Sequence, residues 1–183
     1  MAMSLRFKIV VLVLVVLTAA GVVWFRNVQA ETRKHSPVQT ATLATPGIEV
    51  MYCSPGVKDR AIFGGLVPYN EVWRTGANEP TTFDTQVALQ IGENTLEPGI
   101  YTLWTIPGEE TWQVIWNSSM YPWGVSWGGK PSRKPEKDVL TITVPVTKLD
   151  VLQERLNITL TAEPLQMQLA WENTSITVPM QLK

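Results

Sequence analysis

Hydrophobic residues follow two different patterns along this chain. From Ile9 to Phe25 the sequence contains no charged residue, and this run is preceded by Arg6 and Lys8 and followed by Arg26. A helix of about 17 to 25 apolar residues, each rising about 1.5 Å, is long enough to cross the hydrocarbon core of a bilayer. The first pattern therefore predicts an N-terminal transmembrane helix, which we place in residues 1–28.

The same segment also has features of a signal peptide. Val28-Gln29-Ala30 has the small-residue spacing that a signal peptidase accepts. Against cleavage, the apolar run is longer than the roughly 7 to 15 residues of a signal h-region, and Trp24-Phe25-Arg26 is typical of an interfacial anchor. We expect retention as a single-pass anchor that contacts lipid through residues 9–25. The short N-terminal tail is the easier end to leave in the cytoplasm, which places the remaining chain outside it.

Beyond residue 46 the pattern changes to short alternations of apolar and polar residues separated by Gly, Pro and Asn. Such alternation is typical of strands that bury one face. The predicted strands are Ile48–Tyr52, Thr82–Ile91, Ile100–Ile106, Thr111–Asn117, Val139–Val146, Leu156–Ala162, Met167–Trp171 and Ser175–Val178. About eight short strands without a convincing amphipathic helix predict an all-β domain over residues 47–183, a sandwich or a barrel. Of the two, we expect an antiparallel β-sandwich.

The segment between the two patterns, residues 29–46, consists mainly of Thr, Ala, Pro, Gln and charged residues. It shows neither the helical period nor the two-residue period of a strand. Segments of this composition connect folded parts as extended chain. We therefore expect an extended linker between the membrane segment and the β domain.

Charge and composition exclude several function classes. The formal net charge of the 183-residue chain is -1, so no basic face for nucleic acid is visible. The only histidine, His35, lies in the predicted linker, so the β domain lacks the imidazole of a catalytic triad or of a histidine zinc site. The only cysteine, Cys53, has no partner for an internal disulfide, and a buried thiol is its expected state. We expect no metal, no cofactor and no catalytic residue.

One irregular segment, residues 60–81, combines aromatic, charged and turn residues. Its Ile62-Phe63-Gly64, Leu66-Val67-Pro68-Tyr69 and Val72-Trp73-Arg74-Thr75-Gly76-Ala77-Asn78-Glu79 resemble the signature of DUF2911, a bacterial family of unknown function. Further matching positions are Ser54-Pro55, Lys58-Asp59-Arg60, Pro98-Gly99, Tyr101, Leu103, Trp112, Asn117, Trp123-Gly124, Leu169 and Trp171-Glu172. The resemblance spans roughly residues 48–179 and implies an exported or membrane-attached β domain, with no established activity. In a bacterium, this places the anchor in the inner membrane and the domain in the periplasm.

Two positions depart from the family pattern. Pro80 stands where the family usually has alanine. Thr141 stands, after Asp138-Val139-Leu140, where the family has an arginine. If that arginine contributes to a shared polar site, this chain lacks part of the site.

Arg74, Asn78 and Glu79 form the candidate ligand site. In a binding function, Arg74 and Asn78 donate hydrogen bonds to a small anionic or polar ligand and Glu79 accepts one. The guanidinium fork suits this role because it matches carboxylate and phosphate groups. In the alternative, Arg74 pairs with Glu79, Asp84 or Glu172 inside the domain, and Asn78 caps a turn. The sequence leaves both interpretations open.

Trp123 and Trp127 form the candidate interaction surface. They lie in the Gly- and Pro-rich segment Tyr121–Pro131, where exposed aromatic residues suit protein contacts, sugar stacking or a lipid headgroup layer. A loop that folds back over the edge of the domain is the alternative. The tryptophans of the predicted strands are expected to pack in the core, and they are Trp104, Trp112, Trp116 and Trp171.

These observations lead to three functional hypotheses. The first is a non-catalytic accessory or structural subunit that docks on a larger membrane protein complex, respiratory or photosynthetic. The second is a domain that binds a small polar ligand or a carbohydrate through Arg74, Asn78 and Glu79. The third is a hydrolase that uses two of the carboxylates Glu79, Asp84 and Glu172, as paired carboxylates do on sugars. The first is the hypothesis that we prefer from the sequence.

Overall fold

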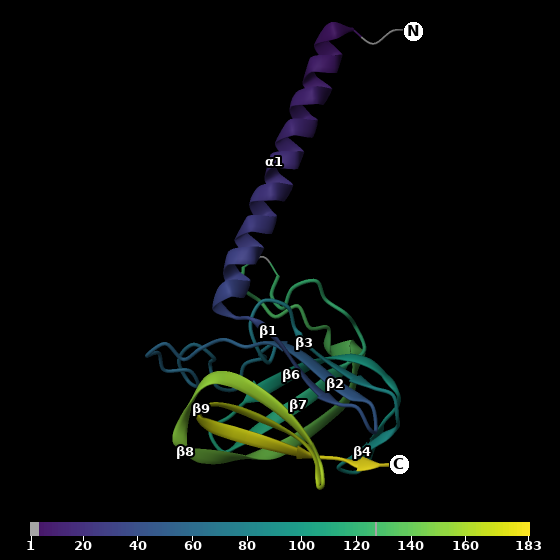
Figure 1. The fold of residues 1–183 in the computed structure, drawn as a ribbon, viewed down its shortest axis with the longest axis vertical. Coiled ribbons are helices and arrows are strands. Elements are labelled where there is room, and N and C mark those ends of the chain that lie inside the picture. The colour runs from purple at the N-terminus through teal and green to yellow at the C-terminus, as the bar shows by residue number, and fades with distance from the viewer. Residues whose placement is uncertain (1–3, 127) are drawn as a thin grey trace. The chain divides into compact units, whose positions relative to one another are not determined.

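The computed structural model describes residues 4–126 and 128–183, apart from the side chain of Leu5. These residues form two compact units, and the boundary between them falls between His35 and Ser36. The first unit is the helix α1, Leu5–His35, and the second is the β domain, Ser36–Lys183 (Figure 1). The strands and the candidate ligand residues all belong to the second unit.

The helix α1 contains the apolar run that the sequence identifies. Its Arg6–His35 segment is long and apolar enough to cross a membrane. A single membrane anchor and an N-terminal signal sequence both have these properties, so α1 is consistent with either. Retention in the membrane stays a prediction.

Residues 29–46, expected to be an extended linker, contain regular structure instead. The helix α1 continues to His35, because the basic residues of its last turn interact favourably with the helix dipole. Val38–Leu43 then form the strand β1, which pairs along its whole length with β2. The side chains of β1 are exposed or half-buried on both faces, and therefore no two-residue alternation marks this strand in the sequence. The β domain begins at Ser36, earlier than expected.

Within the described residues, seven strands form one antiparallel sheet and three short strands form another. The order in the large sheet is β1-β2-β3-β6-β7-β8-β9, and the order in the small sheet is β10-β4-β5. The strands after β1 are β2 (Ile48–Cys53), β3 (Thr81–Thr85), β4 (Leu89–Ile91), β5 (Asn94–Leu96), β6 (Gly99–Pro107), β7 (Thr111–Asn117), β8 (Asp138–Ala162), β9 (Leu165–Pro179) and β10 (Gln181–Leu182). A 3-10 helix, Pro135–Lys137, precedes β8. The large sheet curls into a half-barrel (Figure 1).

The prediction of an antiparallel all-β domain is confirmed, whereas the arrangement differs from two facing sheets of similar size. One curled sheet carries most of the strands, and the short strands β4 and β5 add Leu89, Ile91 and Leu96 to the same hydrophobic core. A strongly curled sheet encloses a core with its own concave face. The domain therefore has the character of a half-barrel rather than of a sandwich.

Four aromatic side chains form a cluster in this core, with Phe63 at its partly buried edge. It consists of Phe63, Trp73, Trp112 and Trp171. Trp73 and Trp171 stack with ring centroids 5.7 Å apart and an interplanar angle of 17°. Phe63 meets Trp112 edge-on, with ring centroids 4.8 Å apart. Offset stacks and edge contacts are the favourable geometries for aromatic pairs, and these rings join β7 and β9 to the irregular segment that carries Arg74.

Trp104 is buried, as expected, but it lies outside the core cluster. Its neighbour Leu103 belongs to the core, and successive residues of a strand point to opposite faces, so Trp104 points to the convex face of the sheet. There the ring of Tyr121 covers it edge-on, with centroids 5.5 Å apart. The hydroxyl of Tyr121 also accepts a hydrogen bond from the Lys134 amide at 2.9 Å. The part of the β7–β8 loop around Tyr121 is therefore folded back over the sheet.

Candidate functional site

The position of Arg74 is determined by the backbone pairing of its neighbour Trp73 with β6. The Trp73 amide donates to the Thr105 carbonyl at 2.7 Å, and the Thr105 amide donates back to the Trp73 carbonyl at 2.9 Å. The Trp73 indole Nε1 donates to the Gly76 carbonyl at 3.0 Å. Trp73 thus pairs with β6 next to the residues of β6 that pair with β3. Its ring lies in the core, and the next side chain, Arg74, lies outside the core.

The loop that follows Arg74 is closed by hydrogen bonds at its base. The Thr81 amide donates to the Arg74 carbonyl at 3.3 Å, and the Thr81 hydroxyl donates to the Thr75 carbonyl at 2.7 Å. Thr75 and Asn78 have positive φ angles of 55° and 58°. A β-branched residue in the left-handed region is strained, and it persists only where the surrounding structure holds it. We therefore regard this loop as a rigid support for Arg74.

A second loop packs directly on the aliphatic part of Arg74. A Cβ atom placed on Gly124 would lie 2.0 Å from Cδ and 2.9 Å from Cβ of Arg74, so only glycine permits this approach. The Gly124 amide donates to the Asn78 carbonyl at 2.9 Å, which ties the two loops together. The stem of Arg74 is thus held between them, and the guanidinium group has a defined position.

No carboxylate partner for the guanidinium group of Arg74 is seen in the part of the chain that the structure describes. Its Nε atom is buried and has no hydrogen-bond partner among the described residues. Among these residues no ion pair joins Arg74 to Asp84 or Glu172, so the pairing of the structural alternative is not seen with these two carboxylates. Burial lowers the pKa of Arg74, although a guanidinium stays protonated at any physiological pH.

Arg74 lines a cavity of about 460 Å³. Most of the wall is apolar and comes from Leu66, Pro68, Val72, Trp73, Val125 and Pro131. The charged residues among the lining side chains are Arg74 and Glu71. The cavity is therefore a mainly hydrophobic space with one cation and one anion at its wall.

Asn78 and Glu79 are not among the residues that line this cavity. The carboxylate of Glu79 accepts a hydrogen bond from the thiol of Cys53, with 3.5 Å between Oε2 and Sγ. The amide side chain of Asn78 is buried and lies beside the same Cys53 thiol. The structure thus places Arg74 at the cavity and the other two residues beside the end of β2. Their part in binding a ligand stays a prediction.

Burial and the neighbouring Glu79 carboxylate raise the pKa of the Cys53 thiol, in that order of importance. The side chain of Cys53 is almost completely buried. Because the thiolate is the reactive form, we expect an aromatic disulfide reagent at pH 8 to modify Cys53 at least tenfold more slowly in the folded chain than in urea. Release of the coloured thiol at 412 nm is a suitable measurement, with free cysteine as the reference. Equal rates in both states would contradict the buried position.

Of the candidate interaction surface, Trp123 is half-buried, next to Gly124. Trp127 lies outside the described residues. The contact between the rings of Tyr121 and Trp104 favours the alternative, in which the loop folds back over the domain. A role of Trp123 and Trp127 in binding a partner stays a prediction.

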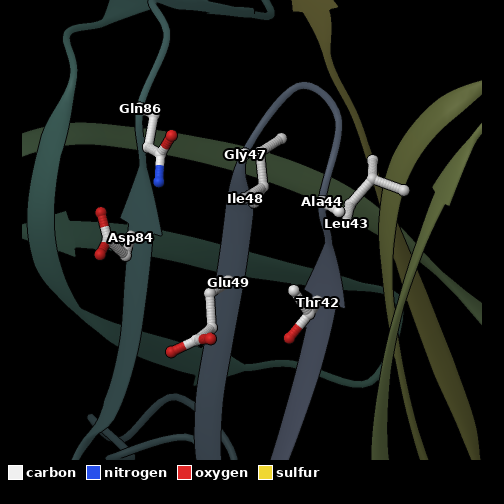
Figure 2. A pocket seen from close by; sticks show the side chains of 8 residues that line it. All are labelled: Thr42, Leu43, Ala44, Gly47, Ile48, Glu49, Asp84 and Gln86. Carbon is white, nitrogen blue, oxygen red and sulfur yellow. The ribbon is translucent and has the colours of Figure 1, made fainter.

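A second cavity, of about 160 Å³, lies over the strands β1, β2 and β3. Figure 2 shows Glu49 and Asp84 on adjacent strands at this cavity, with Thr42 and Gln86 nearby. Glu49 and Asp84 are directly opposite each other in the strand register. Like charges in such a pair disfavour the sheet. The sequence gives no sign of this pairing, because it depends on register.

The three carboxylates of the hydrolase hypothesis have different surroundings. Glu79 contacts Cys53, Asp84 lies opposite Glu49, and Glu172 accepts a hydrogen bond from the Ile62 amide at 3.1 Å. In the part of the chain that the structure describes, no group of three or more histidine, cysteine or acidic side chains is arranged to hold a metal ion. The geometry gives the hydrolase hypothesis no specific support.

The fold and the site together define a class of protein: an antiparallel half-barrel domain that carries a loop-built, arginine-lined cavity and follows an apolar N-terminal helix. The chain belongs to the DUF2911 family, described as a protein of unknown function, whose model matches residues 35–180. The resemblance seen in the sequence is thereby confirmed, and the match covers nearly the whole β domain. No curated protein and no solved structure matches the chain.

Proposed function

We propose that the β domain binds a small anion and that Arg74 recognises it. The observation that supports this proposal is a half-buried guanidinium group, without a carboxylate partner among the described residues, at the wall of a cavity of about 460 Å³. Removing a cation from water is costly unless another group pairs with it. A bound anion supplies that pair.

The cavity has the properties of a small-molecule site. Such sites typically occupy about 300 to 1,000 Å³, have mainly apolar walls and contain a few fixed polar groups. Arg74 is fixed in this sense, because Gly124 holds its stem and the closed loop from Arg74 to Thr81 holds its backbone. A positioned guanidinium needs little further ordering when it binds, which favours affinity.

The location of the domain restricts where the ligand is found. An N-terminal segment such as α1 delivers the chain to a membrane or across it. We propose that α1 is retained in a bacterial inner membrane and that the β domain lies in the periplasm. The ligand is then a solute of that compartment.

Docking on a larger respiratory or photosynthetic membrane complex stays a second proposal, and no contact within the described residues favours it over ligand binding. Extraction of native membranes with a mild detergent, followed by a native gel, distinguishes the two. Migration with a large complex supports docking, whereas migration as a single chain counts against it.

Replacement of Arg74 by methionine is the direct test of anion binding. Methionine retains a flexible apolar stem beside Gly124 and removes the charge. In the full chain in nonionic detergent, isothermal calorimetry with acetate, benzoate and inorganic phosphate is expected to show an affinity for at least one anion in the wild type. The variant should lose about tenfold to a hundredfold of that affinity, as expected for a hydrogen-bonded charge.

Arg155→Met is a matched control, because Arg155 lies on β8 and donates a hydrogen bond to the Ser54 carbonyl at 2.8 Å, and it does not line the cavity. Its affinity should equal that of the wild type. The proposal is wrong if the wild type binds none of these anions, or if Arg74→Met binds them as well as the wild type does.

A further inference from the structure

We infer that the ligand of this cavity is a monocarboxylate with an apolar body. This inference rests on the proposed anion site at Arg74 and concerns the class of anion. It follows from three properties of the cavity wall: the charges that it carries, the geometry of the free donor and the shortage of other polar side chains.

The charges favour an anion of single charge. Arg74 is the cation of the wall and Glu71 is its carboxylate, so their formal charges sum to zero before the ligand enters. A monoanion on Arg74 leaves only the exposed charge of Glu71, which water and salt screen. A dianion such as phosphate adds a second negative charge on the same wall as Glu71. Like charges at one site disfavour that arrangement.

The free donor of Arg74 favours a planar acid. Its Nε atom is buried and without a partner among the described residues. Nε and one terminal nitrogen form an edge of the guanidinium plane, and two parallel hydrogen bonds from such an edge match the two oxygens of a carboxylate. Phosphate sites, in contrast, commonly surround a tetrahedral group with several free backbone amides or a helix N-terminus. The amides of the lining residues Gly124 and Gly129 already donate to the carbonyls of Asn78 and Ser126, and the described wall contains no helix residue.

The remaining wall favours an apolar body and disfavours a sugar. Leu66, Pro68, Val72, Val125 and Pro131 offer no side-chain hydrogen bond. The indole Nε1 of Trp73, the one side-chain donor of that ring, is already bonded to the Gly76 carbonyl. A carbohydrate would leave hydroxyl groups unpaired against such a surface, whereas an alkyl or aryl group gains affinity from it.

Three linear monocarboxylates of increasing size test the inference: acetate, butanoate and hexanoate. Phenylacetate, inorganic phosphate and glucose serve as an aromatic acid, a different anion and a sugar for comparison. For the full chain in nonionic detergent, calorimetry is expected to give about fourfold tighter binding for each methylene that the cavity accepts. Hexanoate and phenylacetate should bind at least tenfold tighter than phosphate, and glucose should not bind.

Two variants test whether individual side chains of the cavity wall determine these affinities. Leu66→Ser, at a half-exposed position that folding tolerates, should weaken hexanoate and phenylacetate severalfold and leave acetate unchanged. Glu71→Gln should strengthen phosphate severalfold and change hexanoate little, because it removes the repelling charge.

The two proposals fail in different ways. Phosphate or glucose binding that depends on Arg74 and equals or exceeds that of phenylacetate would overturn the monocarboxylate inference and leave the anion site intact. Equal affinity for acetate and hexanoate would overturn it as well. If Arg74→Met changes none of the affinities, the anion site itself is refuted.

Discussion

Replacement of Trp171 by alanine is expected to lower the free energy of unfolding of the β domain by about 3 to 5 kcal/mol. Trp171 is almost completely buried, stacks on Trp73 and contacts Phe63 edge-on, with 6.0 Å between ring centroids. The smaller side chain removes apolar contact area and leaves a cavity that the curled sheet fills only in part. Urea unfolding of the full chain in detergent, followed by circular dichroism, measures this loss.

Val151→Ala is the control for this measurement. Val151 lies on β8, the strand that pairs with the strand of Trp171, and its side chain is 78% exposed. Substitution at such a position changes stability by about 0.5 kcal/mol or less. A loss below about 1 kcal/mol for Trp171→Ala would contradict the close packing of the aromatic cluster.

The second large effect is expected for Gly124→Ala. The new methyl carbon would lie 2.0 Å from Cδ and 3.0 Å from Cγ of Arg74, which is far below a van der Waals distance. Relief of this overlap requires a shift of the Arg74 stem or of the loop, and overpacking of this kind costs about 1 to 3 kcal/mol. We also expect the displaced guanidinium to lose most of its anion affinity, as in Arg74→Met.

Gly56→Ala is a matched control, since a Cβ atom there would meet the end of the flexible Glu154 side chain at 3.1 Å. We expect this variant to retain the stability and the anion affinity of the wild type within the error of measurement. Urea unfolding and calorimetry on both glycine variants are the required experiments. Full anion affinity in Gly124→Ala would show that the stem of Arg74 is not held by this contact.

Strands with one buried face were predictable from the sequence. The strand β7 has the predicted bounds, Thr111–Asn117, because Trp112, Val114 and Trp116 alternate with residues on the other face. The edge strand β1 has no such alternation and was missed. The small sheet was also missed. Its strand β4 lies at the end of the expected strand Thr82–Ile91, and β5 is too short and too close to turn residues to show a strand pattern.

Long irregular strands were predictable only in part. The sequence predicts two strands over residues 139–162, whereas the structure has the single strand β8. Between Lys148 and Asn157 its register with β9 shifts twice, and exposed Val151 and Leu152 interrupt the alternation there. Such bulges are set by the partner strand, which a local pattern does not contain.

Arg74 was identifiable because it lies inside the family-like run Val72–Glu79 of an irregular, aromatic segment. Its environment was not, because it depends on contacts between distant parts of the chain. Gly124 meets the Arg74 stem through the closure of two separate loops, and Glu71 becomes relevant only because it lines the same cavity. The position of Trp123-Gly124 among the family-like residues was the one sequence signal for this second loop.

The described residues that line the larger cavity fall between residues 66 and 131 of the β domain. Under the anion-binding proposal, the residues that select the ligand and the apolar N-terminal segment are therefore separate parts of the sequence. Proteolytic maturation at the N-terminus would then change the subcellular distribution and the local concentration of the β domain, and the proposed ligand selectivity would stay the same. Paralogues with a different leader sequence and the same two loops would share that selectivity.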